Sequence, residues 1–169
     1  LGGGLASYAD AILLPERPFS KAKLLNYLRE KKQEGRRGLV LVVSESAHPE
    51  GETPEIAFQV SNSPVTERFG GVAQKLARWL EEELDWEARA VVPGHLQRSR
   101  SPTTTDRFLT ALMGVEAAKM VLEGAWGQMV VYRNGQVVRA PMSSIAKGAR
   151  IIPKDHKWIE VAESLGIFI

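Results

Sequence analysis

The run Leu39-Val40-Leu41-Val42-Val43 is the clearest strand pattern in this sequence of 169 residues. It is uniformly apolar and mostly β-branched, which is typical of a parallel strand covered on both faces. Ser44, Glu45 and Ser46 follow it directly. Ligands of open α/β sheets bind beyond the carboxyl ends of the strands. The run therefore predicts an α/β core, and also the edge of that core where a ligand site is expected.

The segments on either side alternate between strand and helix patterns. Upstream, the short apolar run 11–15 predicts a second buried strand, and a helix follows from an N-cap at Ser20 to Gly35. Before this strand, Gly2-Gly3-Gly4 is too short for a phosphate loop and predicts a closely packed helical segment. Strand, helix and strand in this order indicate a parallel sheet with right-handed crossovers.

The rest of the chain first continues this alternation of strands and helices and then departs from it. Residues 48–64 have the composition of an irregular loop, a helix is expected from about Thr66, and residues 88–92 predict a third short strand. A long helix is expected from Ser101-Pro102 to Gly124. Beyond it, Asn134-Gly135 between two apolar runs predicts a β-hairpin. A last helix is expected at residues 155–165.

The composition narrows the function classes. The net charge is +2, with 22 basic against 20 acidic residues, and the pI is about 9.0. The pI alone would favour a nucleic-acid binder, but aromatic residues do not interleave with the basic runs as a stacking platform requires. The lack of cysteine excludes a disulfide framework, a thiolate zinc site and a cysteine nucleophile. No apolar run approaches the roughly 18 residues of a membrane span. The lack of cysteine is consistent with a cytoplasmic protein, and the mixed charges favour a small anion over a polyanion as its partner.

Two predicted strand ends carry side chains suited to a phosphorylated ligand. Arginine pairs two oxygens of a phosphate with its planar fork, and a carboxylate such as Glu45 accepts hydrogen bonds from sugar hydroxyls. Arg89 and Arg98 could supply the cations, with His95 beside them. The residues alone leave simpler interpretations open: a solvated Glu45, a structural His95, and an Arg89 paired at the surface with Glu87 or Asp85.

A long motif begins at Glu87 and reads Glu87-Ala88-Arg89-Ala90-Val91-Val92-Pro93-Gly94-His95-Leu96-Gln97-Arg98, continued by Ser101-Pro102 and Asp106-Arg107. Upstream stand Ala9-Asp10 with Pro15-Glu16, and the strand end Val42-Val43-Ser44-Glu45-Ser46-Ala47. Together these resemble the 6-phosphofructokinase family, which has E-T-R, a short strand and G-H-x-Q-R-G-G-x-P-x-x-x-D-R, and upstream A-D-x-x-x-x-P-E and V-[AS]-E-G-A. Order and spacing agree up to about Arg139.

The resemblance implies roles for particular residues. Four of them would bind fructose 6-phosphate: Glu45, Arg89, His95 and Arg98. Arg89 would reach the site of a neighbouring subunit, which implies a homotetramer with shared sites. Glu16 and Arg36 fall where bacterial members hold an allosteric nucleotide or phosphoenolpyruvate. No metal ligand and no catalytic residue is implied within this chain.

The implied fold is α/β, a three-layer sandwich around a parallel sheet of the phosphofructokinase type. Residues 1–97 would form a sugar-phosphate-binding domain. Residues 98–151, a helix and a β-hairpin, would return to the nucleotide domain, and the C-terminal helix in residues 152–169 would return to the sugar-phosphate domain. Without the rest of the nucleotide domain, the helix and hairpin would lack the sheet that buries them.

The implied activity is phosphoryl transfer from ATP with Mg²⁺ to fructose 6-phosphate, giving fructose 1,6-bisphosphate in glycolysis. This chain would supply the acceptor side and be inactive alone, because no glycine-rich phosphate loop or catalytic aspartate motif of the family occurs in it. A pyrophosphate-dependent enzyme of the same fold is an alternative. So is a non-catalytic regulatory paralogue, since Ser46, Ser99 and Arg100 stand where the family has glycine.

Overall fold

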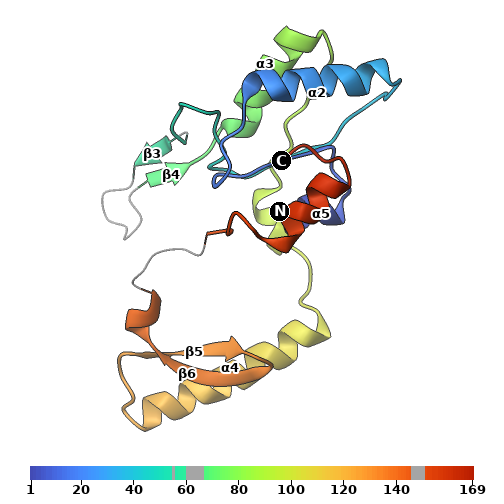
Figure 1. Ribbon diagram of the computed structural model, residues 1–169. Helices are drawn as coiled ribbons and strands as arrows, with labels where there is room; N and C mark the ends of the chain where they lie inside the picture. Colours follow the sequence, from blue (N-terminus) through green and yellow to red (C-terminus); the bar gives the residue numbers. More distant parts are fainter. Residues whose placement is uncertain (55, 60–66, 146–150) are drawn as a thin grey trace. The chain divides into compact units, whose positions relative to one another are not determined.

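The structure, a computed structural model, describes residues 1–54, 56–59, 67–145 and 151–169 (Figure 1). The chain divides into two compact units. The first unit consists of Leu1–Val92 and Ile151–Ile169, and the second of Pro93–Arg150. The first unit is therefore built from two separate stretches of chain. Assigning the units to a sugar-phosphate domain and a nucleotide domain stays a prediction.

A parallel pair of strands forms the centre of the first unit. β1 (Ala11–Leu13) pairs with β2 (Leu41–Val43), with Ala11 opposite Leu41. The other edge of β1 is covered by Phe168: the Ile12 amide donates to the Phe168 carbonyl at 2.8 Å, and the Phe168 amide donates to the Asp10 carbonyl at 3.0 Å. The two predicted parallel strands are confirmed, each somewhat shorter than its apolar run.

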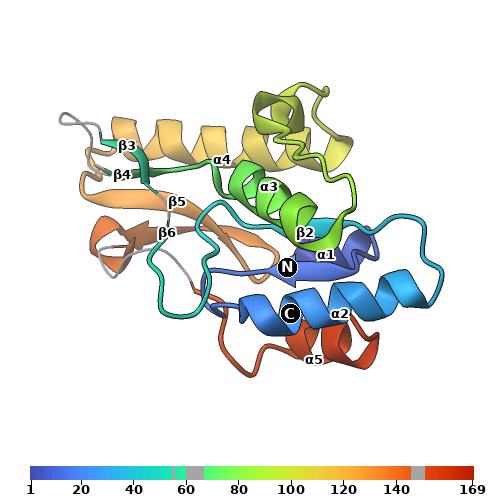
Figure 2. The same cartoon turned by 90° about the horizontal axis from the view of Figure 1, so that it is seen from above.

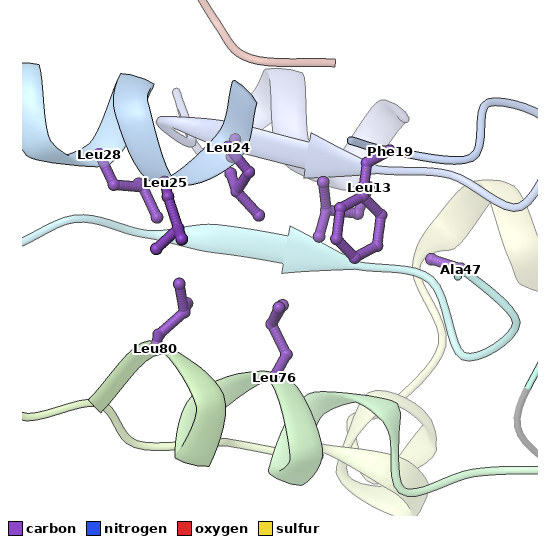
Figure 3. Close-up of a cluster of buried hydrophobic side chains, with 9 residues drawn as sticks. Leu13, Phe19, Leu24, Leu25, Leu28, Ala47, Leu76 and Leu80 are labelled. Carbon is purple, nitrogen blue, oxygen red and sulfur yellow. The ribbon is translucent and has the colours of Figure 1, made fainter. Parts of the chain in front are cut away.

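Two helices cover one face of this sheet. α2 (Lys21–Gln33) begins at Ser20, whose hydroxyl accepts from the Lys23 amide, and α3 (Val72–Leu84) packs near it. Leucines of both helices point toward one another around β2 (Figure 3). The buried residues of this cluster are Ala11, Leu13, Phe19, Leu24, Leu25, Leu28, Ala47, Leu76 and Leu80.

The opposite face of the sheet has its own core. Successive strand residues point to opposite faces, and Ile12 accordingly belongs to a second cluster with Ala9, Leu14 and Ala162. α1 (Gly2–Ala6) and α5 (Lys157–Ser164) contact each other and cover this face. Helices on both sides of a parallel sheet give the expected three-layer α/β fold.

The glycines near the N-terminus form the predicted helical segment. A Cβ added at Gly4 would lie 2.5 Å from Cγ1 of Ile12. Ile12 is fully buried and its branched side chain cannot move aside easily. The glycine therefore lets α1 approach β1 closely, which explains why this position has no side chain.

Basic side chains of α2 donate hydrogen bonds to the C-terminal end of α3. The ammonium group of Lys32 donates to the carbonyls of Leu84 and Asp85 at 2.9 and 3.2 Å, and Arg29 donates to the Glu83 carbonyl at 3.3 Å. The last carbonyls of a helix have no partners within it and carry partial negative charge. These contacts satisfy them and join the two helices.

The second unit pairs one helix with one hairpin. It contains η1 (Gly94–Arg98), α4 (Thr104–Leu122), β5 (Gln128–Arg133), β6 (Gln136–Pro141) and η2 (Met142–Ile145). α4 lies along the β5–β6 hairpin (Figure 2). Asn134 and Gly135 both have positive φ, 51° and 80°, as a two-residue hairpin loop requires. The predicted hairpin is confirmed.

Arg139 of β6 joins the hairpin to α4 through two carboxylates. Its Nε donates to Oε1 of Glu116 at 2.6 Å, and its Nη1 donates to Oε2 of Glu123 at 2.5 Å. The hydrogen bond from Arg139 lowers the pKa of Glu123. Hydrogen bonds to Glu123 and Glu116 raise the pKa of the Arg139 guanidinium.

We expect this attachment to weaken in acid. Because the folded pKa of Glu123 is depressed, its stabilisation is present above the unfolded glutamate pKa of about 4.3 and is lost as the pH falls through the lower folded value. Hydrogen-exchange protection of the hairpin, corrected for intrinsic rates, should therefore fall below about pH 4. Arg139→Gln should flatten that fall. Arg133→Gln, an exposed arginine of the same hairpin, should leave it unchanged, and equal profiles for the two variants would contradict the assignment.

Two predictions between residues 48 and 70 are wrong where the structure describes them. β3 (Ile56–Gln59) pairs antiparallel with β4 (Glu67–Phe69) inside and beyond the expected loop. The following helix begins at Val72, after Gly71 with φ of 85°, and not at about Thr66. Glycine adopts this left-handed conformation without steric cost, and it separates the strand from the helix. Residue 55 and residues 60–66 lie outside the described part.

The predicted third strand at residues 88–92 is also wrong. These residues form neither strand nor helix, and Val91 and Val92 are 81% and 60% exposed. A cavity of about 290 Å³ lies between this segment and β2, lined by Leu41 and Val43 on one side and by Ala88 and Val91 on the other. The β-branched composition indicates a strand, but pairing depends on non-local contacts. Residues 88–92 do not pair with β2, whose partner strand is β1.

Candidate functional site

Glu45 lies in the turn that follows β2. The Ser44 amide donates to the Leu13 carbonyl at 3.0 Å, and the Ala47 amide donates to the Ser44 carbonyl at 2.9 Å. These bonds fix the turn at the carboxyl edge of the sheet, and the Glu45 side chain is exposed there. Within the described ranges, its carboxylate has no hydrogen-bond or ion-pair partner. It is available to accept hydrogen bonds from a ligand.

Arg89 pairs with Glu87 at the surface. Its Nε donates to Oε1 of Glu87 at 2.8 Å, its Nη2 also contacts that oxygen, and its side chain is 83% exposed. The hydrogen bond to Glu87 raises the pKa of the Arg89 guanidinium. Of the interpretations that the sequence leaves open, the surface pair with Glu87 is the one present in this chain. A reach into a neighbouring subunit stays a prediction.

His95 and Arg98 lie on one turn of η1. This helix follows Pro93, with the Leu96 amide donating to the Pro93 carbonyl at 2.8 Å. Because a 3₁₀-helix has about three residues per turn, side chains three positions apart share a face. His95 and Arg98 have this spacing, and both are exposed. Neither has a side-chain partner within the described part of the chain.

The two serines that replace family glycines fit their turns without strain. Ser99 ends η1 with φ of −83°, and its hydroxyl donates to the Leu96 carbonyl at 2.8 Å. Ser46 does not have positive φ either. Left-handed φ is the conformation that favours glycine, so neither turn needs a glycine for its backbone.

The four predicted sugar-phosphate residues divide evenly between the two units. His95 and Arg98 share one turn of the second unit. Glu45 and Arg89 belong to the first unit, but Arg89 lines the cavity beside β2 and Glu45 does not. Their joint role as a fructose 6-phosphate site stays a prediction.

The predicted effector residues line two different cavities. Oε1 of Glu16 accepts from the Ile152 amide at 3.1 Å, and this carboxylate lines a cavity of about 600 Å³ together with Lys154 and His156. Arg36 pairs with Asp10 at 2.7 Å and lines a cavity of about 290 Å³. In the described part of the chain, the two residues thus line separate cavities. Their effector role stays a prediction.

Sequence patterns did not indicate one further cavity. It measures about 200 Å³ and is lined by Lys21, His48 and Trp79, among others. Its residues come from the start of α2, the loop after β2, and α3, which are far apart in the sequence. No single motif contains them, so only the fold reveals the cavity.

The described residues contain neither a metal-binding cluster nor a membrane-spanning helix. No group of three or more His, Cys, Asp or Glu side chains there is arranged to hold a metal ion. No helix there is long and apolar enough to cross a bilayer.

The chain is similar to known phosphofructokinases over nearly its whole length. It is 31% identical over 166 residues to the ATP-dependent 6-phosphofructokinase of Spirochaeta thermophila, which covers 98% of this chain and 45% of that protein. It is 34% identical over 165 residues to ATP-dependent 6-phosphofructokinase 2 of Streptomyces coelicolor, covering 98% of this chain and 48% of that protein. The chain therefore spans about half the length of these curated relatives.

Solved structures show the same fold. The T-state crystal structure of Pichia pastoris phosphofructokinase has a TM-score of 0.60 and 25% identity, covering 97% of this chain and 16% of that chain. Pyrophosphate-dependent phosphofructokinase from Nitrosospira multiformis has a TM-score of 0.60 and 24% identity, covering 86% and 35%. At 24% identity, the similarity to the second structure shows a shared fold and nothing further.

The family profile described as phosphofructokinase matches residues 1–121. This range is well over half of the chain and includes Glu45, Arg89, His95 and Arg98. Profile, relatives and fold agree, and the chain belongs to the phosphofructokinase family.

Proposed function

We propose that the protein carrying this chain transfers a phosphoryl group to fructose 6-phosphate, giving fructose 1,6-bisphosphate, and that this chain supplies the acceptor-sugar side. One observation carries the proposal furthest: His95 and Arg98 share one exposed turn at the position of the family's sugar-phosphate motif. A guanidinium without an internal partner can pair two phosphate oxygens at once. The proposed step belongs to glycolysis.

The state of the other two residues fits this role. The Glu45 carboxylate is exposed at the carboxyl edge of the sheet, where it can accept from sugar hydroxyls. The Arg89–Glu87 pair is exposed, and such pairs contribute little stability. A phosphate dianion could therefore replace Glu87 on Arg89 at small cost. We include in the proposal that Arg89 does so at the site of a neighbouring subunit, within a homotetramer.

ATP is the proposed donor because the curated relatives are named ATP-dependent enzymes. ATP would enter with Mg²⁺. The described residues do not form a cluster suited to a metal ion. The proposal assigns the nucleotide, the metal and the catalytic base to parts of the protein other than this chain.

The surface of α4 supports a place for the second unit in a nucleotide domain. Phe108, Leu112 and Val115 are exposed on this helix, and so is Leu122 at its end. A helix with apolar residues on most sides is normally buried in a larger core, and large exposed apolar patches mark interaction surfaces. We propose that residues 98–151 complete the nucleotide domain of the whole protein.

Assays of the full-length protein with each donor test the function. We expect fructose 1,6-bisphosphate to form from fructose 6-phosphate with ATP and Mg²⁺. If product forms with pyrophosphate but not with ATP, the proposed donor is wrong and fructose 6-phosphate remains the acceptor. Binding of fructose 6-phosphate without turnover with either donor would instead identify a regulatory paralogue. If the protein neither binds fructose 6-phosphate nor turns it over, the proposal is refuted.

A further inference from the structure

The segment that leads from α3 to Arg89 is held at its base by two charged side chains. Asp85, the residue that ends α3, has a φ of 47°. Few residues other than glycine adopt this left-handed conformation, and contacts from neighbouring elements help to keep it. Lys32 of α2 and Glu81 of α3 make such contacts with the chain between Leu84 and Ala88.

Lys32 contacts three successive residues of this turn. Its Nζ donates to the carbonyls of Leu84 and Asp85 at 2.9 and 3.2 Å. The same Nζ lies over the Trp86 ring, 5.3 Å from its centroid, and a cation in this place is attracted to the face of an indole. One ammonium group therefore joins α2 to both the backbone and a side chain of the turn.

Glu81 holds the residue directly before Arg89. Oε1 of Glu81 accepts from the Ala88 amide at 3.0 Å, so the last turn of α3 is joined to the chain that leaves it. After Arg89 the chain is open to solvent, and Val91 is 81% exposed. The base of Arg89 is thus fixed from its N-terminal side.

The position of this base decides where the Arg89 guanidinium can reach. An arginine side chain loses much rotamer freedom when it is held by a ligand. A base that also moved would add to that loss, so a fixed base favours binding by pre-organisation. Most of the contacts described above are made to backbone atoms, which set the place of Arg89 whichever rotamer its side chain adopts.

We propose that Lys32 and Glu81 are positioning residues for Arg89: they hold residues 84–88 so that the guanidinium reaches the phosphate of the sugar. This inference rests on the proposed function, because Arg89 is there assigned to fructose 6-phosphate. The phosphate already on the sugar does not react. Loss of either contact therefore weakens substrate binding and leaves the chemical step unchanged.

Steady-state kinetics of the full-length protein tests this role. Lys32→Met and Glu81→Ala should each raise the KM for fructose 6-phosphate about three- to tenfold, the effect of one hydrogen bond, with kcat unchanged. Lys32→Arg should restore the wild-type KM, because a guanidinium also donates to carbonyls and stacks on an indole. Glu81→Gln should restore it as well, because an amide oxygen can accept from the Ala88 amide.

Two matched variants control for lost charge on the same helices. Lys23 of α2 and Glu82 of α3 are exposed, and neither is among the residues that hold this turn. Lys23→Met and Glu82→Ala should keep the wild-type KM. An equal rise in these variants and in Lys32→Met and Glu81→Ala would overturn the positioning role.

An Arg89→Ala background decides whether the effect passes through Arg89. Arg89→Ala alone should raise the sugar KM, and adding Lys32→Met should then cause no further rise. A further rise of the same size would overturn the positioning role, and so would a fall in kcat at constant KM in Lys32→Met, which shows only lost stability.

The same set of variants separates this inference from the proposed function. If Arg89→Ala raises the sugar KM and Lys32→Met and Glu81→Ala do not, the positioning role is refuted and the proposed function stands. If Arg89→Ala leaves the sugar KM unaltered, the assignment of Arg89 to the sugar phosphate is wrong, and the positioning role is refuted with it.

Discussion

Replacing Arg98 by alanine in the full-length protein should raise the KM for fructose 6-phosphate about 10- to 100-fold. Arg98 lies exposed on η1 and has no side-chain partner among the residues that the structure describes, so its guanidinium can bind the phosphate. Hydrogen bonds to charged groups contribute about 1.5–3 kcal/mol, and each 1.4 kcal/mol is about a factor of ten. The KM for the nucleotide should change little, because this residue is assigned to the acceptor side. Steady-state kinetics with each substrate varied in turn measures both constants.

Arg133→Ala is the matched control for this experiment. Arg133 is another exposed arginine of the second unit, at the end of β5, and its loss removes the same charge. We expect wild-type constants for it. An unaltered sugar KM in Arg98→Ala would show that the assignment of Arg98 is wrong. An equal rise in both variants would show that net charge, and not Arg98 itself, sets the affinity for the sugar phosphate.

Leu24→Ala should destabilise the first unit by about 2–5 kcal/mol. Leu24 is fully buried between α2 and the sheet, and truncation removes apolar contacts and leaves a cavity. Whole domains are stable by only about 5–15 kcal/mol, so the loss is a large fraction of the total. Urea unfolding followed by tryptophan fluorescence should show a clearly lower midpoint.

Lys23→Ala separates burial from helix propensity in this test. Lys23 is the exposed neighbour of Leu24 on α2, and surface substitutions usually change stability by less than about 0.5 kcal/mol. If both variants unfold at the same midpoint, the cluster around Leu24 does not hold the first unit together.

Local patterns predicted the elements whose reasons are local. The apolar runs of β1 and β2, the N-cap at Ser20 and the Asn134-Gly135 loop each act over a few residues. The same holds for the position of Glu45 directly after β2. For these features, the physical cause lies within a few neighbouring residues of the sequence.

The errors concern features that depend on distant contacts. Residues 88–92 have the composition of a strand, but a strand exists only when another pairs with it, and composition does not report this. The pairing of β3 with β4 was hidden by the turn-forming residues around it. Packing, and not spacing, also decides the partners of Glu16 and Arg36, the Ile152 amide and Asp10. The effector role of these two residues stays a prediction.

The contact of Phe168 with β1 has a consequence for protein synthesis. The ribosome makes Ala11 before Phe168, and at about 5–20 residues per second the interval between them is on the order of ten seconds. During that time the nascent strand has a bare edge, to which other chains can add. Translation speed through the second unit and chaperone binding near β1 should therefore affect the yield of folded protein.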